Sequence, residues 1–346
     1  MRVGIIGYGL AGRVIHGRLL AGTEDAEVVA VVTRDPGRRA EALRDFPAVT
    51  CFDTVGQMLA TARLDLAVVA TVTAAHPANA LDCLQAGVAT VVDKPLAADA
   101  EQAARIVAAA GGTPLTVFQN RRWDADQLTL RRLREQDRLG QVLRYESRFE
   151  RWRPQVDPTR WRDVTGPAQG GGALLDLGAH LVDQALTLFG PALSVYGEVE
   201  TRRAGGSTGP SAEFGDDDAF IALHHANGTY SHLWCSAIAA AAGPRLRVLG
   251  SAAAYVVDEL DGQEDALRAG LPVSEAKPRT GWLVRGAERE SVDPARGRWD
   301  VFYPAVLAAL RSGGTMPVDP MDAVRALEVI DAARRSALGH ETIRLG

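Results

Sequence analysis

The feature that most constrains the fold lies at the start of the chain, where a short apolar run (2–6) leads through a glycine-rich turn into helical spacing (11–20). Gly7 permits a tight turn, Gly9 lets phosphates approach the backbone, and Gly12 lets the helix pack closely on the strand. Free N–H groups at the helix N-terminus favour a pyrophosphate. The turn predicts dinucleotide binding, and the alternative is an ordinary glycine-rich βα turn. The residues expected at the phosphates are Gly7, Tyr8, Gly9, Leu10, Ala11 and Gly12.

Apolar strands alternate with helices through the first 120 residues. Near-continuous apolar strands separated by helices of about ten residues are typical of a parallel sheet covered on both faces. Asp53 and Asp99 are expected to cap the helices that follow them. The sequence therefore predicts a doubly wound parallel (Rossmann) domain over residues 1–120. Its strands are expected at 2–6, 28–32, 49–52, 66–71, 88–92 and 115–118, and its main helices at 11–20, 36–43, 77–86 and 100–110.

From about Arg121 the pattern changes to longer segments with alternating apolar residues. Turn signals such as Asn227-Gly228 predict hairpins in a mainly antiparallel sheet. The class is therefore α/β followed by an α+β domain over residues 121–346. Strands are expected at 142–152, 194–203, 219–225, 229–238, 246–249 and 253–257, and helices at 124–135, 173–189, 301–311 and 321–337.

Charge and cysteine content exclude several classes of protein. The net charge is −5 with no basic tract, which argues against nucleic acid and anionic membranes as partners. Apolar runs such as 66–75 are shorter than the ~18–20 residues that span a bilayer. No leader is recognised before the first strand. Cys51, Cys83 and Cys235 share no close spacing, so neither disulfides nor a metal are expected, and we predict a soluble, cytoplasmic protein.

The end of the second strand bears on which dinucleotide binds. A site that prefers NAD places a carboxylate at this tip, where it accepts hydrogen bonds from the ribose. Here Thr33 and Arg34 follow the strand, with Arg38 and Arg39 one turn further on. Guanidinium groups suit a 2′-phosphate, so the sequence predicts NADP. The alternative is that Arg34 is solvated and Asp35 holds the ribose of NAD.

Lysine is scarce, because only Lys94 and Lys277 occur among the 38 basic residues. An amine is a compact donor with an adjustable pKa, which a guanidinium is not. Lys94 follows the strand at 88–92 and precedes Pro95. Ligands of open parallel sheets bind at the carboxyl ends of the strands, so Lys94 is expected in the cleft. The alternative is that either lysine survives by chance.

A second cluster lies in the helix predicted at 173–189. Asp176, His180 and Asp183 have the spacing of one helix face. A histidine flanked by carboxylates is a natural proton acceptor. The preceding glycines, 170–172, are expected to let a substrate approach closely. The alternatives are a solvated polar face and a metal pair, and the metal is disfavoured because no third ligand is evident.

A dinucleotide site, a lysine and an Asp/His pair together fit one reaction. A hydride leaves a carbon that bears a hydroxyl while a base removes the hydroxyl proton. We expect His180 to take the proton, Asp176 to orient His180, and Lys94 to donate a hydrogen bond to the oxygen. A nicotinamide accepts the hydride, and the reverse direction reduces a ketone. A dinucleotide-dependent sensor, the non-enzymatic alternative, has no need of all three residues.

With these residues in hand, the chain resembles the Gfo/Idh/MocA oxidoreductase family over essentially its whole length. The resemblance rests on the glycine turn, the Asp93-Lys94-Pro95 motif and the Asp176…His180 helix. The common family form of the second motif is Glu-Lys-Pro, so the side chain before the lysine is shorter here. The resemblance implies a catalytic set at Lys94, Asp176 and His180. It also implies coenzyme contacts at Thr71, Thr73, His76, Asp93 and Lys94.

Longer strings are similar to the NADP-dependent scyllo-inositol dehydrogenases of that family. They lie at 119–124, 153–156, 160–162 and 261–270. This implies an NADP-dependent enzyme for a cyclic polyol, with scyllo-inositol as the best guess and another sugar (an aldose or pyranose) as the alternative. It also implies an open-faced C-terminal sheet through which a homodimer or homotetramer associates. The residues expected to hold substrate hydroxyls are Asn120, Arg122, Trp161 and Asp183.

Overall fold

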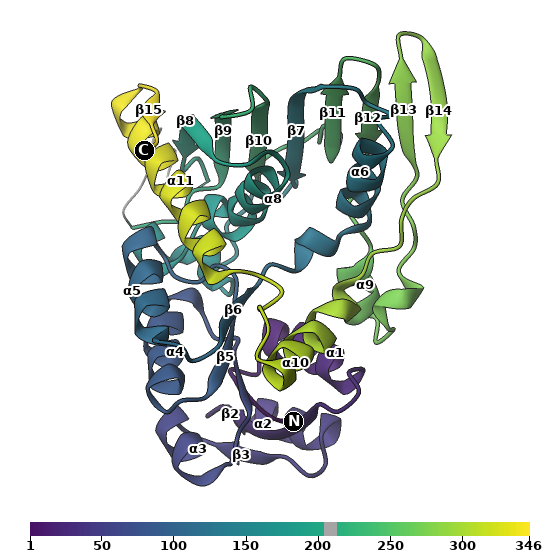
Figure 1. Ribbon diagram of the computed structural model, residues 1–346. Coiled ribbons are helices and arrows are strands. Elements are labelled where there is room, and N and C mark those ends of the chain that lie inside the picture. The colour runs from purple at the N-terminus through teal and green to yellow at the C-terminus, as the bar shows by residue number, and fades with distance from the viewer. Residues whose placement is uncertain (204–212) are drawn as a thin grey trace.

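A computed structural model describes residues 1–203 and 213–346 and contains two large sheets with helices between and beside them (Figure 1). The first sheet has six parallel strands in the order β3-β2-β1-β4-β5-β6. The predicted doubly wound fold is confirmed. Its strands are β1 (Arg2–Ile6), β2 (Glu27–Val32), β3 (Thr50–Phe52), β4 (Leu66–Val69), β5 (Ala89–Asp93) and β6 (Leu115–Phe118). Its helices are α1 (Arg18–Ala21), α2 (Pro36–Asp45), α3 (Val55–Thr61), α4 (His76–Gln85) and α5 (Ala100–Ala110).

Side-chain caps mark the starts of three of these helices, α2, α3 and α5. Asp99 accepts a hydrogen bond from the Gln102 N–H at 2.8 Å, so the predicted cap of α5 is confirmed. The prediction that Asp53 caps α3 is wrong. Thr54 occupies that position in an extended conformation, and its hydroxyl accepts from the Gln57 N–H at 3.2 Å. Hydroxyl and carboxylate caps are chemically similar, so the sequence alone left the two neighbours hard to separate.

The second sheet has nine strands in the order β14-β13-β12-β11-β7-β10-β9-β8-β15. Every pairing is antiparallel except that of β7 with β10, which is parallel. The predicted hairpin at Asn227-Gly228 joins β9 to β10, and Gly228 has a φ of +85°. The strands are β7 (Val142–Glu150), β8 (Ala192–Glu200), β9 (Asp218–His225), β10 (Tyr230–Ser236), β11 (Leu246–Gly250), β12 (Ala254–Val257), β13 (Gly281–Arg285), β14 (Glu288–Val292) and β15 (Ile343–Arg344).

The hairpin of β13 and β14 was absent from the sequence prediction. Four of the five residues of β14 are exposed, and three of the five are charged, so the strand lacks the apolar alternation that marks a half-buried strand. Gly286, which has a φ of +59°, makes the turn between the two strands. Neighbouring β12 supplies the pairing that holds β13 in the sheet.

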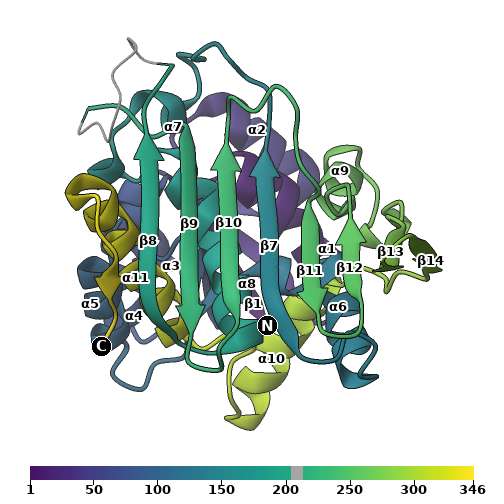
Figure 2. The ribbon, with the colours of Figure 1, turned by 90° about the horizontal axis from the view of Figure 1, so that it is seen from above.

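Helices cover one face of the second sheet and leave the other face open. In Figure 2 the strands β8, β9, β10 and β7 lie in front, and the helices lie behind them. The mainly antiparallel, open-faced sheet is therefore confirmed. Among the described residues, no helix is both long and apolar enough to cross a membrane. The helices of this half are α6 (Ala125–Glu135), α7 (Trp161–Val164), α8 (Ala179–Phe189), α9 (Gln263–Arg268), α10 (Phe302–Ser312) and α11 (Pro320–Gly339).

Helix α10 returns to the first sheet. Trp299, Phe302 and Tyr303 are buried in one apolar cluster with Val3 and Ile5 of β1. The Phe302 ring lies edge-on to that of Phe118 at the end of β6, with ring centroids 4.8 Å apart. One face of the first sheet is thus closed by residues that lie about 180 positions after its last strand.

Candidate functional site

The glycine turn after β1 has the geometry that a pyrophosphate needs. Gly7 has a φ of +91°, and a Cβ there would lie 2.8 Å from the Ala70 carbonyl oxygen. A Cβ on Gly12 would collide with the Gly7 carbonyl oxygen. Side chains are therefore excluded where the helix start approaches the strand, and backbone N–H groups stay accessible. These residues fit a dinucleotide.

Tyr8, predicted beside the phosphates, contributes only backbone there. Its side chain is buried, and its hydroxyl donates to Asp45 at 3.0 Å. Arg13 donates to the same carboxylate at 2.7 Å. Burial and the neighbouring Asp45 carboxylate raise the pKa of Tyr8, so the phenol stays neutral. The tyrosine therefore anchors the helix that begins at Leu10 to the end of α2.

A cavity of about 550 Å³ opens beside the turn and the end of β2. Arg34 and Arg38 line it, and both side chains are exposed. The Asp35 carboxylate caps α2 by accepting from the Arg38 N–H at 2.7 Å. Arg39 pairs at 2.5 Å with Asp53, which also lines this cavity. The other lining residues from the predicted coenzyme set are Gly7, Tyr8, Thr33 and Thr71.

His76 joins the loops that follow β4 and β5. Its Nδ1 lies 2.8 Å from the Pro95 carbonyl oxygen and its Nε2 lies 3.1 Å from that of Thr71. Burial lowers the pKa of His76. Thr73, on the first of these loops, is buried directly against Gly170. The predicted coenzyme residues here therefore fix the loops at the carboxyl edge of the sheet.

Asp93 is buried just before Lys94 and accepts a hydrogen bond from the Lys94 N–H at 2.9 Å. The His16 Nε2 lies 3.6 Å from the same carboxylate, and the His16 Nδ1 lies 2.6 Å from the Tyr303 hydroxyl oxygen. Burial alone would raise the pKa of Asp93, but His16 and Lys94 outweigh burial and lower it. An ionised Asp93 thus fixes the backbone that carries Lys94.

Lys94 and Asp176 meet although 82 positions separate them. The Lys94 ammonium donates to the Asp176 carbonyl oxygen at 2.6 Å and to its carboxylate at 2.9 Å. Arg162 also contacts that carboxylate, at 3.1 Å. Burial alone would raise the pKa of Asp176, but the two cations outweigh it and lower the pKa. An ammonium has three donors, so one N–H of Lys94 remains for a ligand oxygen.

His180 is buried at the start of α8, and its pKa is well below the ordinary 6.5. Burial is the largest cause, and the charges of Lys94 and Arg121 add to it. The imidazole is therefore neutral at pH 7 and able to accept a proton. Its Nδ1 has no hydrogen-bond partner among the residues that the structure describes.

The expectation that Asp176 orients His180 is wrong. The Asp176 carboxylate is engaged by Lys94 and Arg162, and no hydrogen bond joins it to His180 in the described part of the chain. The predicted continuous helix is also interrupted, because Leu174–Gly178 form a wider π-helical turn before α8. Such a turn changes the angular step between residues, so spacing of four no longer places two side chains on one face.

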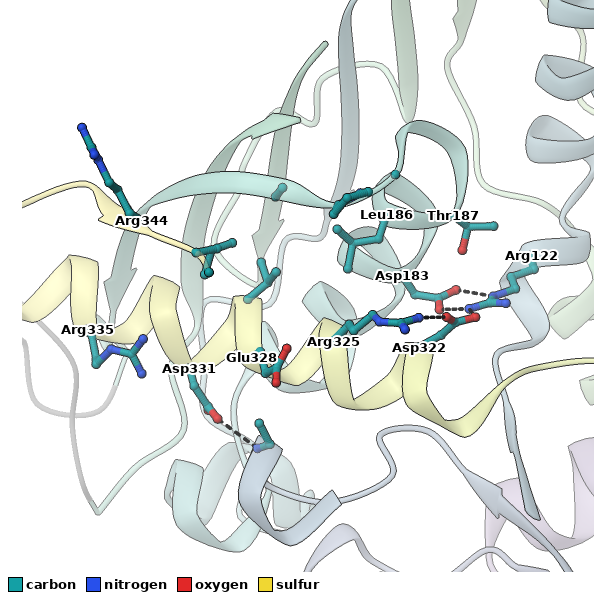
Figure 3. A pocket seen from close by; sticks show the side chains of 17 residues that line it. Arg122, Asp183, Leu186, Thr187, Asp322, Arg325, Glu328, Asp331, Arg335 and Arg344 are labelled. Carbon is teal, nitrogen blue, oxygen red and sulfur yellow. Dashed lines mark hydrogen bonds and ion pairs between the residues drawn. The ribbon is translucent and has the colours of Figure 1, made fainter. Parts of the chain in front are cut away.

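Arg122 and Asp183 lie outside this cluster. Figure 3 shows them at one end of a cavity of about 1020 Å³, whose lining includes none of Lys94, Asp176 and His180. Arg122 donates twice to Asp183, at 2.8 and 2.5 Å, and also to Asp322 of α11 at 3.0 Å. The expectation that Asp176, His180 and Asp183 share one helix face is wrong at Asp176, which lies in the π-helical turn, whereas His180 and Asp183 both lie in α8. A buried carboxylate needs a cation, and Arg122 is that cation.

The glycines at 170–172 make room for protein rather than for a substrate, which corrects the expectation. A Cβ on Gly170 would meet Thr73, one on Gly171 would meet the Thr165 carbonyl, and one on Gly172 would meet Asp216. The loop before the π-helical turn is therefore closely packed, and this packing places Asp176 opposite Lys94.

Asn120 and Trp161, the remaining predicted substrate residues, lie on different elements. Asn120 is buried immediately after β6, the strand beside the one that carries Lys94. Trp161 is half-buried at the start of α7, with the Arg162 guanidinium 4.5 Å from its ring centroid. Their role in substrate binding stays a prediction.

Several arginines near Asp176 had no role in the sequence prediction. Arg151, Arg153, Arg160 and Arg162 line a small cavity of about 30 Å³ that Asp176 also borders. Three of these arginines lie in the strings at 153–156 and 160–162, which the sequence analysis used only as evidence of a family resemblance. Charge alone did not reveal that the two strings meet in space.

Comparison with known proteins gives the Gfo/Idh/MocA family, the one that the sequence motifs resemble. A profile of the oxidoreductase family's NAD-binding Rossmann fold matches residues 1–120, and one of its C-terminal α/β domain matches residues 131–345. The scyllo-inositol 2-dehydrogenase (NADP(+)) IolW of Bacillus subtilis is 31% identical, over 100% of this chain and 96% of that protein. The uncharacterized oxidoreductase YdgJ of Escherichia coli is 35% identical, over 100% and 99% of the two chains.

A solved structure agrees with the sequence relatives. The oxidoreductase yvaA from Bacillus subtilis superposes with a TM-score of 0.89 at 30% identity, covering 100% of this chain and 98% of that chain. Both halves of the fold are therefore shared, and so is the order in which they follow each other. The chain belongs to the Gfo/Idh/MocA oxidoreductase family and is a dehydrogenase acting on CH–OH groups, with an NAD(P)-binding Rossmann fold.

Proposed function

We propose that the protein is an NADP-dependent dehydrogenase of a cyclic polyol, with scyllo-inositol as the best single guess. The observation that carries the proposal is the ion pair of Lys94 with Asp176 close to a neutral, buried His180. The relative of known activity named above acts on scyllo-inositol with NADP(+), which supports the same choice. Another sugar, an aldose or pyranose, is the alternative, because ring alcohols differ in only a few contacts.

In this proposal the residues divide the work on one alcohol. The free N–H of Lys94 binds the hydroxyl oxygen and stabilises negative charge on it as the proton leaves. His180 accepts that proton, since its lowered pKa keeps the imidazole neutral at pH 7. Asp176 holds the ammonium in place. When bound, the nicotinamide supplies the hydride acceptor.

Turnover of a panel of ring alcohols tests the substrate. The panel contains scyllo-inositol, myo-inositol and common aldoses, each with NADP and with NAD, and reduced nicotinamide is followed by absorbance. We expect the highest kcat/KM for an inositol with NADP. Turnover of an aldose alone would favour the alternative, and no turnover of any ring alcohol would contradict the proposal.

The choice of NADP rests on the cavity beside β2. Arg34 and Arg38 present guanidinium groups there, and the Asp35 carboxylate is engaged in capping α2. Asp53, at the end of β3, also lines the cavity, and its carboxylate pairs with Arg39. A 2′-phosphate would be attracted by both cations, whereas a ribose hydroxyl gains little from them.

Replacing Arg34 with Asp is expected to lower the kcat/KM ratio of NADP to NAD by ~10–100-fold, because one charge-assisted hydrogen bond is exchanged for repulsion. Initial rates with both coenzymes measure the ratio. Arg44→Asp is the matched control, since it makes the same charge change on an exposed residue of α2 that does not line the cavity. An unchanged ratio in Arg34→Asp would locate the phosphate elsewhere.

We also propose that two or four copies associate through the open face of the second sheet. The rings of Phe220 and Trp234 are half-buried on this face with their centroids 5.0 Å apart, and the Arg148 guanidinium lies 3.8 Å from the centroid of the Trp234 ring. Such a cluster supports an interface. Light scattering of the purified protein measures the mass of the assembly.

We propose in addition that the enzyme works in the cytoplasm. All three cysteines are free thiols, which supports a reducing compartment.

A further inference from the structure

The small cavity beside Asp176 is unusual in its charge. We call it the arginine recess. It lies between the 151–163 segment, the start of the π-helical turn and the end of β10. Five guanidinium groups line it against two carboxylates, so its walls carry excess positive charge. The lining residues that carry charge are Arg151, Arg153, Arg160, Arg162, Arg203, Asp163 and Asp176.

Two of the five guanidinium groups are neutralised by the protein. Arg203 pairs with Asp163 at 3.2 Å and with Asp217 at 3.3 Å. Arg162 pairs with Asp176. The two carboxylates of the recess are thus already taken, and three cations are left in a small space.

The other three, Arg151, Arg153 and Arg160, have no ion pair within the described residues. Arg151 and Arg160 are half-buried, and Arg153 lies at the rim. Burial is the main cause that lowers the pKa of Arg151 and of Arg153, and neighbouring guanidinium groups lower it further. Gathering unpaired cations costs free energy, and an anion in the recess would recover it.

The recess adjoins the proposed reaction centre. Asp176 borders the recess and also accepts two hydrogen bonds from Lys94, so the two sites share one residue. A substrate whose hydroxyl contacts Lys94 therefore has this recess next to it. The volume of about 30 Å³ corresponds to roughly two water molecules, which is the size of a carboxylate rather than of a sugar ring.

We propose that the substrate carries an oxyanion, most simply a carboxylate, that binds Arg151, Arg153 and Arg160 while a neighbouring hydroxyl is bound by Lys94. Among ring alcohols, one that also carries an oxyanion, such as a uronic acid, is then expected to bind in preference to its neutral counterpart. This inference rests on the proposed dehydrogenase activity and narrows its substrate. A sugar phosphate has the same oxyanion chemistry and is separated from a carboxylate by the test.

The test compares matched substrates with and without the charge. kcat/KM with NADP is measured for D-glucuronate, D-glucose 6-phosphate, D-glucose and scyllo-inositol. We expect D-glucuronate to exceed D-glucose by at least ~10-fold, and the ratio of the two to fall ~10–100-fold in Arg151→Gln and in Arg160→Gln. Arg105→Gln, an exposed arginine of α5, is the control and should leave the ratio unchanged.

Binding gives a readout that does not depend on turnover. Calorimetric titration of D-glucuronate into the protein–NADP complex should detect binding that both recess variants weaken and Arg105→Gln does not. A preference for D-glucose 6-phosphate would support the oxyanion site and identify phosphate as its ligand. Equal rates for charged and neutral substrates, together with binding insensitive to the recess variants, would overturn the inference.

The two proposals fail in different ways. If inositols are oxidised with no preference for either anion, the proposed function stands and the recess inference is wrong. If no substrate is oxidised but D-glucuronate binds through Arg151 and Arg160, the recess is an oxyanion-binding site and the proposed function is wrong.

Discussion

Lys94→Arg is expected to lower kcat by ~10²–10⁴-fold at pH 7, while the dissociation constant of NADP changes by less than ~3-fold. The Lys94 ammonium is a compact donor that bonds Asp176 twice, which leaves one N–H for the substrate oxygen of the proposed reaction. A guanidinium is longer and planar, so it cannot make the same three bonds from one nitrogen. Initial rates give kcat, and quenching of tryptophan fluorescence gives the affinity for NADP.

The chain offers a matched control for this substitution. Lys277→Arg changes the only other lysine of the sequence, which is exposed and lines neither the cavity beside β2 nor the arginine recess. We expect kcat of this variant within about 2-fold of the unmodified enzyme, as is usual for surface changes. If Lys94→Arg were equally active, the amine would have no part in the reaction.

His180→Ala is expected to remove ~10²–10⁴-fold of the rate of alcohol oxidation at pH 7, because no neutral base remains beside Lys94. The loss should shrink as the pH rises. Hydroxide becomes more abundant and more of the alcohol is ionised, so the reaction depends less on the imidazole to remove the hydroxyl proton. His224→Ala serves as the control, because that ring stacks on Tyr230 at 4.6 Å in the β9–β10 hairpin. The pH dependence of kcat/KM for both variants is the measurement.

The unmodified enzyme has its own pH signature. Burial and nearby cations lower the pKa of His180, so the neutral, proton-accepting form persists below pH 6.5. Oxidation should therefore show no fall near 6.5 and decline only at a lower pH, where the imidazole becomes protonated. If kcat/KM of the unmodified enzyme fell near pH 6.5, and this fall were absent in His180→Ala, then the pKa of His180 would not be lowered and the assignment would be wrong.

Much of the fold could be predicted because it depends on patterns among residues that are close in sequence, such as apolar runs and turn dipeptides. The apolar runs of the first half fixed six parallel strands, and Asn227-Gly228 fixed a hairpin, since both depend on neighbours in sequence. The strand β14 could not be predicted, because its exposed charged residues are held in the sheet only by pairing with β13. Strands of that kind depend on tertiary context.

The sequence predicted which residues lie near the candidate site better than it predicted which of them contact one another. The meeting of Lys94 with Asp176 follows from strand ends and a helix start, which topology brings together. The link between Asp176 and His180 was mistaken, because periodicity of an α-helix was assumed through a segment that winds as a π-helical turn. Asp183 follows His180 within the regular helix α8, and its partner Arg122 comes from a distant part of the chain. Nothing in the residue types over 174–178 marks that change.

The packing of Trp299, Phe302 and Tyr303 onto β1 and β6 has a consequence for recombination within this family. A chimaera joined at residue 120 would combine residues 1–120 of one relative with the α10 region of another. Aromatic residues that do not match would then leave voids between α10 and the first sheet. A productive exchange therefore needs two crossovers, one after β6 and one around α10, so that the nucleotide-binding half travels with the distant residues that seal it.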